Sequence, residues 1–238
     1  MSFREIWWQL LILAVCSYFL GNVNFAIILS KVRHKDITKS GSGNPGTMNM
    51  LRTFGIGLGL ATLLLDVLKG VLPALAGRLI FAGAETEAGF PWNMLAMYLG
   101  GLFVVLGHVF PCLHHRGGKG VATTIGVFLC GCWWVALICF FVGVVYIFFF
   151  EYGGVGSLIM ITGFVVEQIT VFFLNGTPRT PEFWVLLGIL LFFVLLSFIM
   201  HRGNLARMAK GTENRTQLRK MLSRKKKSEP PEKDSPES

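Results

Sequence analysis

Glycines flank a lysine where one apolar segment of the chain ends and the next begins. The run Gly-Gly-Lys-Gly at 117–120 follows Arg116 and directly precedes the apolar segment that starts at Val121. Glycine allows backbone N–H groups to approach a ligand closely, and a helix that opens there adds its positive end. With a lysine beside them, these groups are suited to phosphate. The run predicts a phosphate site at the edge of a membrane span, with a plain connecting turn as the alternative.

A second polar segment, 40–53, has the same glycine-rich character. Its hydrogen-bonding side chains are those of Ser42, Asn44, Asn49 and Arg52. The planar guanidinium of Arg52 can bind phosphate through two hydrogen bonds. Proline suits the first turn of a helix, so a short helical turn is expected from Pro45 to Thr53. The alternative is a flexible loop whose arginine only marks the membrane side.

Further candidates lie at the ends of later apolar segments. Glycines at 153–156 open one segment, with Ser157 close to its start. His201 and Asn204 follow the last segment and, three residues apart, share one face of a continuing helix. Such a pair could polarise or deprotonate a substrate hydroxyl. Alternatively, His201 caps the end of the last helix, where a cation is favoured.

Other titratable residues are expected to be structural. Asp66 and Lys69 lie three apart inside an apolar segment, where each charge costs about 2.5–3.5 kcal/mol. An ion pair between them is expected, and a proton or ion path is the functional alternative. His108 near a span end is expected to be a satisfied structural donor rather than a catalyst. His114 and His115 have no carboxylate or cysteine pair beside them, so no metal site is predicted.

Composition places the chain among membrane proteins. It is 53% hydrophobic and only 15% charged, against about 25% charged in soluble domains. The net charge of +9 does not indicate nucleic acid, because the cations gather in the loops and the tail. The five cysteines are expected to be small apolar residues, since Cys130 and Cys132 have the wrong spacing for redox or zinc motifs. The chemistry therefore takes place at the surface of a helical membrane protein.

Hydropathy predicts an all-α membrane protein. Spans are expected at about 6–30, 54–80, 92–111, 157–174 and 182–200, with an uncharged run at 121–150. As one helix that run would be about 45 Å long, which exceeds the hydrocarbon core of about 30 Å. It is therefore expected to fold as two spans with a break at 131–134, where two tryptophans suit a membrane interface. This gives seven transmembrane helices.

The distribution of charge sets the predicted orientation. With seven spans, one side holds the loops at 31–53, 114–120 and 151–156 together with the tail. That side carries every Lys and Arg of the chain with four exceptions, which are Arg4, Lys69, Arg78 and Arg179. Because positive loops face the cytoplasm, the N-terminus is predicted outside and the tail in the cytoplasm. The three candidate segments then face the cytoplasm together.

These segments, in this order, resemble the bacterial acyl-phosphate:glycerol-3-phosphate acyltransferase family (PlsY). The likeness extends from Gly21 to about Arg215. It is carried by five blocks, at 41–55, 66–70, 107–123, 156–157 and 201–213. The chain departs from the family pattern at Asn22, Asn24, Glu151 and Gly154.

The resemblance implies a seven-span enzyme without metal or cofactor. It would transfer a fatty acyl group from acyl phosphate to the 1-hydroxyl of glycerol 3-phosphate, giving lysophosphatidic acid and phosphate. The implied catalytic residues are Ser42, Arg52, Lys119, His201 and Asn204. The implied substrate-binding residues are Asn44, Gly117, Gly118, Lys119, Gly120 and Ser157. Asp66, Lys69 and Glu213 would be structural. The proton acceptor stays open between a substrate phosphate and His201.

The same resemblance implies a multi-pass protein of the bacterial inner membrane. Its partners would be glycerol 3-phosphate, fatty acyl phosphate and membrane lipids, with the enzyme that makes acyl phosphate as a further candidate and no nucleic acid. Residues 1–215 would form the acyltransferase domain. Residues 216–238 read as a basic, disordered cytoplasmic tail facing anionic lipid. The competing hypothesis is a transporter or channel that uses Asp66 and Lys69, although no inverted repeat is visible.

Overall fold

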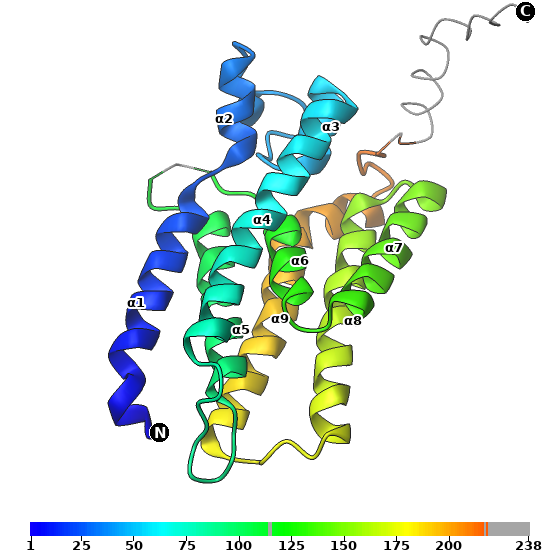
Figure 1. Ribbon diagram of the computed structural model, residues 1–238. Helices are drawn as coiled ribbons and strands as arrows, with labels where there is room; N and C mark the ends of the chain where they lie inside the picture. Colours follow the sequence, from blue (N-terminus) through cyan, green and yellow to red (C-terminus); the bar gives the residue numbers. More distant parts are fainter. Residues whose placement is uncertain (114–115, 217, 219–238) are drawn as a thin grey trace, which may run out of the picture.

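The computed structural model describes residues 1–113, 116–216 and 218, and its regular structure is helical (Figure 1). In chain order the elements are α1 (Phe3–Asn22), α2 (Phe25–Val32), the 3-10 turn η1 (Ile37–Lys39), α3 (Thr47–Phe54), α4 (Ile56–Ile80), α5 (Trp92–Val109), α6 (Val121–Leu129), α7 (Trp133–Phe150), α8 (Gly153–Leu174) and α9 (Pro181–Ala209). Six segments of this described part are long and apolar enough to cross a membrane: α1 with α2, α4, α5, α7, α8 and α9. The predicted all-α membrane class is confirmed.

The first apolar segment, expected as a span at 6–30, is one of these six but is not a continuous helix. It breaks at Val23, between α1 and α2. The Asn22 side chain accepts hydrogen bonds from two backbone N–H groups of the segment after α5, at 2.7 and 3.1 Å. The Asn24 side chain accepts from the N–H of Ile27 at 3.0 Å and so caps α2. Asn24 thus satisfies the backbone where the helix restarts, and Asn22 ties the end of α1 to the segment after α5; both asparagines are departures from the family pattern.

The uncharged run at 121–150 breaks close to the expected position. Helix α6 ends at Leu129 and α7 begins at Trp133. Arg78 donates a hydrogen bond to the backbone carbonyl of Cys130, which α6 leaves unpaired. Helix α6 has nine residues and is therefore about 14 Å long, too short to cross a core of about 30 Å. This is why six described segments, rather than seven, have the length of a span.

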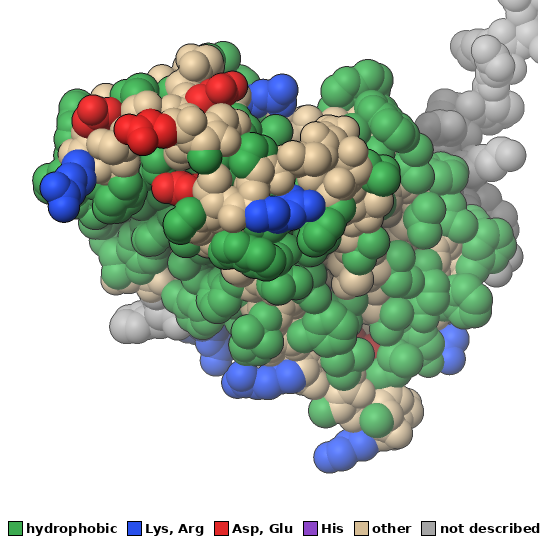
Figure 2. All heavy atoms as spheres, turned by 90° about the horizontal axis from the view of Figure 1, so that it is seen from below, with side chains coloured by type: hydrophobic (Ala, Val, Ile, Leu, Met, Phe, Trp, Pro, Cys, Tyr) green, Lys and Arg blue, Asp and Glu red, His purple; other side chains and the backbone are tan. Residues whose placement is uncertain are grey.

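All segments that carry the predicted site lie at one end of the bundle. In Figure 1 the N-terminus is at the lower end, and α3, the start of α6, the start of α8 and the segment after α9 are at the upper end. The lower end is seen face-on in Figure 2, where acidic side chains gather among hydrophobic ones. Exposed or half-exposed acids there are Glu5, Glu85, Glu87 and Glu182. The bundle is thus asymmetric in charge, as the sequence predicted.

The chain returns to the bundle after α9. Gly211 takes a left-handed conformation (φ 69°), and the N–H of Thr216 donates to the carbonyl of Glu151 at 3.0 Å. Thr216 is buried. The expected division after residue 215 stays a prediction, because most of the basic tail (217 and 219–238) lies outside the described residues.

Candidate active site

A cavity of about 530 Å³ opens among α3, α4, α6, α7, α8, α9 and the segment after α9. Its volume lies in the range of small-molecule sites. Polar and charged side chains line one part: Ser42, Asn44, Arg52, Lys119, Ser157, His201, Asn204, Arg207 and Glu213. Apolar side chains line the other: Leu63, Ile125, Phe140, Val144, Ile147, Met160 and Met200. The cavity therefore suits a ligand with a polar head and an apolar chain.

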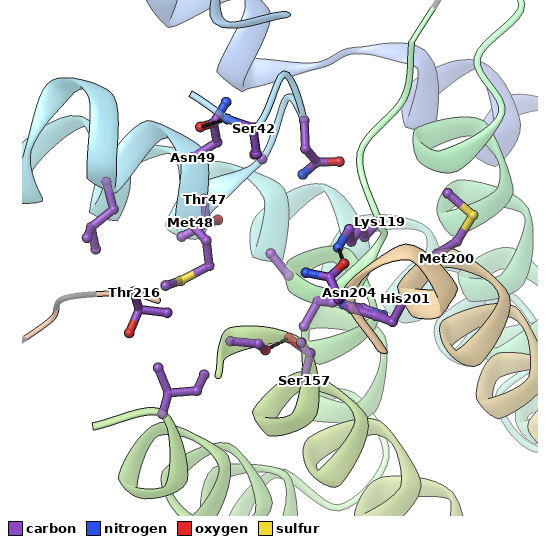
Figure 3. A pocket seen from close by; sticks show the side chains of 18 of the residues that line it. Ser42, Thr47, Met48, Asn49, Lys119, Ser157, Met200, His201, Asn204 and Thr216 are labelled. Atoms are coloured by element: carbon purple, nitrogen blue, oxygen red, sulfur yellow. Dashed lines mark hydrogen bonds between the residues drawn. The ribbon is translucent and has the colours of Figure 1, made fainter. Parts of the chain in front are cut away.

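Lys119 and Asn204 meet in this cavity although they lie far apart in sequence (Figure 3). The Lys119 ammonium donates to Oδ1 of Asn204, and the Asn204 amide donates to Glu213. The second carboxylate oxygen of Glu213 accepts from Arg207 Nε at 2.8 Å. Glu213 thus holds one amide and one cation in place.

Three cations lie around the polar part of the cavity. They are Arg52, Lys119 and Arg207. Burial lowers the pKa of Lys119 to about 8; the Glu213 carboxylate raises it, while Arg207 and Arg52 lower it further. Burial also lowers the pKa of Arg52, but a guanidinium stays charged. The site therefore holds more positive charge than Glu213 balances, and an anion there would relieve the repulsion.

The segment before α3 is a compact turn built on Asn49. The Asn49 side chain accepts from the N–H of Ser42 at 3.1 Å and donates to the carbonyl of Ser40 at 2.9 Å. Asn49 is 1% exposed and does not offer its amide to a ligand as freely as predicted. The predicted helical turn is present, but α3 starts at Thr47 instead of Pro45. Asn49 therefore holds Ser42 at the rim of the cavity.

His201 lies inside α9, which continues for two further turns to Ala209. The alternative in which His201 caps the end of the last helix is wrong for this reason. Its Nδ1 is 2.9 Å from the carbonyl of Ser197 and donates to it, so the neutral ring keeps Nε2 as an acceptor. Ser157, one turn into α8, donates to the carbonyl of Gly153 at 2.8 Å. Both side chains line the cavity and are buried.

The predicted cradle of four residues is only partly realised. Lys119 and Gly120 line the cavity, and Gly120 (φ 79°) is the N-cap residue directly before α6. Gly117 and Gly118 instead pack against the end of α5, where a Cβ on Gly117 would overlap the carbonyl of Val109. The missing side chains of these two glycines therefore let the turn pack against the end of α5, and they do not make room for a ligand.

Asp66 and Lys69 form the predicted ion pair, at 2.7 Å. Asp66 also lines the cavity, together with His108. His108 is buried and bonded to Lys69, as expected of a structural histidine. His114 and His115 lie outside the described residues.

Several residues that line the cavity were not predicted from the sequence. Arg207, Asn214 and Thr216 lie in or after the last turns of α9, beyond the apolar segment that ends near residue 200. The spacing of three residues between Asn204 and Arg207 was a usable signal, because residues three apart share one face of a helix and α9 continues unbroken there. Nothing in the local sequence indicated that residues 213–216 turn back to the cavity.

A membrane bundle with a cationic, half-apolar cavity at one end belongs to the class of membrane proteins whose site suits an anionic, lipid-like molecule. Residues 11–211 match the family model described as glycerol-3-phosphate acyltransferase. A glycerol-3-phosphate acyltransferase of Shouchella clausii (strain KSM-K16) is 40% identical over 200 residues, covering 83% of this chain and 91% of the relative. One from Gluconobacter oxydans (strain 621H) is 37% identical over 213 residues, covering 88% and 94%.

Two solved structures share the fold. Both are crystal structures of PlsY (YgiH), an integral membrane glycerol 3-phosphate acyltransferase, in the glycerol 3-phosphate form and the lysophosphatidic acid form. Each is 29% identical; the TM-scores are 0.75 and 0.74, and each covers 90% of this chain, matching 98% and 99% of the solved chain. The chain belongs to the glycerol-3-phosphate acyltransferase family and is an integral membrane acyltransferase. None of these relatives supports a transporter or channel.

Proposed function

We propose that this protein transfers a fatty acyl group from acyl phosphate to the 1-hydroxyl of glycerol 3-phosphate, releasing lysophosphatidic acid and phosphate. The observation that carries the proposal is one cavity in which Arg52, Lys119 and Arg207 surround the polar part and apolar side chains line the rest. Both substrates carry phosphate, and one carries an acyl chain. The relatives named above are glycerol-3-phosphate acyltransferases, and one solved structure is in a glycerol 3-phosphate form.

The cationic residues are assigned to the two phosphates. Lys119, held by Asn204, binds the phosphate of glycerol 3-phosphate, with Ser42 and Asn44 at the same rim. Arg52 and Ser157 face the acyl phosphate. Charged hydrogen bonds of this kind are shorter and stronger than neutral ones. The excess of positive charge around Glu213 supports this arrangement.

The reaction forms one ester bond and breaks one acyl–phosphate bond. The hydroxyl oxygen of glycerol 3-phosphate attacks the acyl carbon, and the bond from that carbon to the phosphate oxygen breaks. The hydroxyl proton goes either to a substrate phosphate or to Nε2 of His201. Phosphate is a good leaving group, so orienting the hydroxyl and stabilising negative charge are the main tasks of the enzyme.

The apolar part of the cavity is assigned to the acyl chain. Its lining includes Phe140, Val144 and Ile147 of α7, together with Ile125 of α6 and Met160 of α8. Helix α7 is the least buried of the six candidate spans, because 17% of its 18 residues are buried inside the protein. A chain lying beside α7 would thus stay close to the lipid from which it comes.

A bulky residue at Val144 is expected to shorten the acyl chain that the enzyme accepts. For Val144→Trp, kcat/KM for a sixteen-carbon acyl phosphate should fall about tenfold or more relative to an eight-carbon donor, because the indole fills the apolar part. The control is Val142→Trp on the same helix, since Val142 is 49% exposed. Equal losses for both donors in Val144→Trp would contradict the assignment.

The lowered pKa of Lys119 predicts an alkaline loss of substrate binding. Its cation is present below about pH 8 in the free enzyme and is lost as pH rises through that value. The kcat/KM for glycerol 3-phosphate should fall about tenfold per pH unit above that value. In Lys119→Arg the charge persists, so this loss should move to higher pH. An unchanged profile in Lys119→Arg would exclude Lys119 as the titrating group.

We place the cavity at the cytoplasmic face of the bacterial inner membrane, with the N-terminus outside. The cavity end carries Lys31, Arg33, Lys35, Lys39 and Arg202 as exposed cations, against the acidic opposite end. This asymmetry follows the positive-inside rule. Cysteine labelling at Glu87 and Lys35 in intact cells tests it, because only the residue at 87 should react with an impermeant reagent.

The function is tested with purified protein in detergent or vesicles. Palmitoyl phosphate and labelled glycerol 3-phosphate should give lysophosphatidic acid, whereas palmitoyl-CoA and palmitoyl carrier protein should give none. Product from the thioesters alone would overturn the choice of donor. No product from any donor, with folded protein, would overturn the proposed function.

A further inference from the structure

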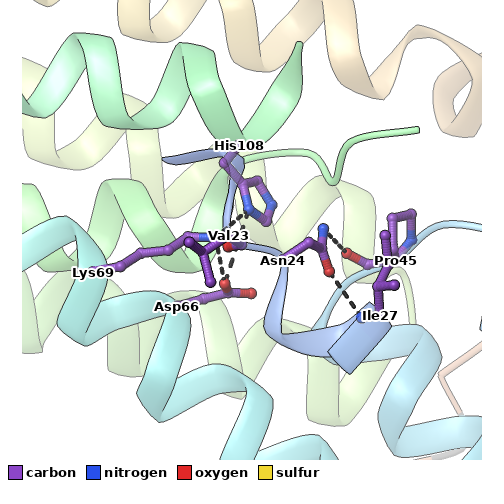
Figure 4. A network of polar contacts seen from close by, with 7 residues as sticks. All are labelled: Val23, Asn24, Ile27, Pro45, Asp66, Lys69 and His108. Carbon is purple, nitrogen blue, oxygen red and sulfur yellow. Dashed lines mark hydrogen bonds and ion pairs between the residues drawn. The ribbon is translucent and has the colours of Figure 1, made fainter. Parts of the chain in front are cut away.

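Beneath the cavity, Lys69 is fully enclosed by polar acceptors from three segments of the fold (Figure 4). Its Nζ lies 2.7 Å from Asp66 Oδ1, 2.8 Å from the carbonyl oxygen of Val23 and 2.7 Å from Nδ1 of His108. Lys69 and Asp66 are each 1% exposed and His108 is 4% exposed. An ammonium has three donors, and here each has a partner. Lys69 is therefore not available to a ligand.

The carbonyl of Val23 can accept from Lys69 because the first apolar segment breaks there. In an uninterrupted helix this oxygen would accept from the fourth residue along the chain. The break between α1 and α2 leaves it free within the membrane, where an unsatisfied carbonyl is costly. Lys69 thus ties the start of α2 to α4, and its contact with His108 extends the network to α5.

His108 connects this network to the turn that carries Lys119. Because Lys69 donates to Nδ1, the neutral ring carries its proton on Nε2. That edge of the ring packs against Gly118, where an added Cβ would overlap Nε2. The N–H of Gly118 also donates to the backbone carbonyl of His108, at 3.1 Å. Both ring and backbone of His108 therefore contact the residue next to Lys119.

We propose that Asp66, Lys69 and His108 are positioning residues that hold the Gly117–Gly118 turn so that Lys119 points at Asn204 and the polar part of the cavity. They act through the turn: Asp66 orients Lys69, Lys69 fixes the ring of His108, and the ring supports Gly118. This inference rests on the proposed function, because it concerns the lysine assigned to glycerol 3-phosphate. It gives the buried charges a role in substrate affinity in addition to stability.

The decisive variant is His108→Phe, which keeps a ring but removes the acceptor for Lys69. Displacing Lys119 should raise KM for glycerol 3-phosphate about tenfold, since errors of about 1 Å in a site can cost up to about 100-fold. KM for palmitoyl phosphate should stay within about twofold of wild type. His108→Asn keeps an acceptor for Lys69 but has no ring to support Gly118, so it should raise KM for glycerol 3-phosphate in the same selective way.

A matched control separates positioning from stability. Tyr98→Phe removes another buried hydrogen bond, to Gln168, at residues that do not line the cavity. It should lower the melting temperature in detergent but leave both KM values unchanged. A purely structural role for the network would give His108→Phe the same pattern as Tyr98→Phe, and that result would overturn the inference.

A second variant approaches the network from the turn. Gly118→Ala should raise KM for glycerol 3-phosphate in the same selective way, because its Cβ displaces the ring of His108. It decides the matter if His108→Phe does not fold, and a wild-type KM in Gly118→Ala would then overturn the inference. A wild-type enzyme that makes no lysophosphatidic acid would instead refute the proposed function.

Discussion

Replacing Lys119 with Met lowers the rate of lysophosphatidic acid formation by about two to three orders of magnitude. The reason is that the ammonium is the cation held by Asn204 in the polar part of the cavity. Removing the charged partner of the glycerol 3-phosphate phosphate in a buried site costs about 2–5 kcal/mol, and the expected loss in kcat/KM for glycerol 3-phosphate lies within that range. The loss is measured as initial rate with saturating palmitoyl phosphate and a range of glycerol 3-phosphate concentrations.

Lys210→Met is the control for the loss of one positive charge outside the cavity. Lys210 is exposed at the end of α9 and does not line the cavity, so its rate should stay within about twofold of wild type. Combining Arg52→Ala with Lys119→Ala removes both cations assigned to the substrates. Full activity in that double variant would refute the assignment of the site.

The sequence predicted the helical class and which end of the bundle carries the site, because both depend on hydropathy and charge along the chain. It also predicted the interruption of the run at 121–150 from its length. It did not predict the break at Val23, since the apolar character continues through that residue. Only Asn22 and Asn24 marked the position; Asn24 caps α2 locally, but both side chains also bond to distant segments.

The roles of individual glycines could not be read from the motif. The missing side chain of a glycine next to a lysine can let a ligand approach the backbone closely, or it can let another part of the protein do so. Gly120 lines the cavity, whereas Gly118 makes room for His108. The difference is set by the tertiary position of α5, which the local sequence does not encode. The contact of Lys119 with Asn204 is likewise invisible before the helices are packed.

The position of Lys119 also depends on how α6 packs against α4, because Lys119 lies two residues before the start of α6. Two glycines make this contact close in a reciprocal manner. A Cβ on Gly126 of α6 would overlap the carbonyl of Val67, and a Cβ on Gly70 of α4 would overlap the carbonyl of Thr123. Small residues at such contacts allow helix backbones to approach in a membrane.

Gly126→Ala is therefore expected to destabilise the protein by about 3 kcal/mol, at the upper end of overpacking effects, because the obstacle is backbone and cannot rotate away. The melting temperature in detergent should fall, and activity should fall with it as α6 and Lys119 shift. Alanine favours the helix over glycine by about 1 kcal/mol, so a loss of stability in Gly126→Ala must come from the packing of α6 against α4.

Gly188→Ala is the matched control, since nothing lies within 4 Å of a Cβ added there. Its melting temperature should be equal to or above that of wild type, and an equally stable Gly126→Ala would show that α6 is free to move away from α4.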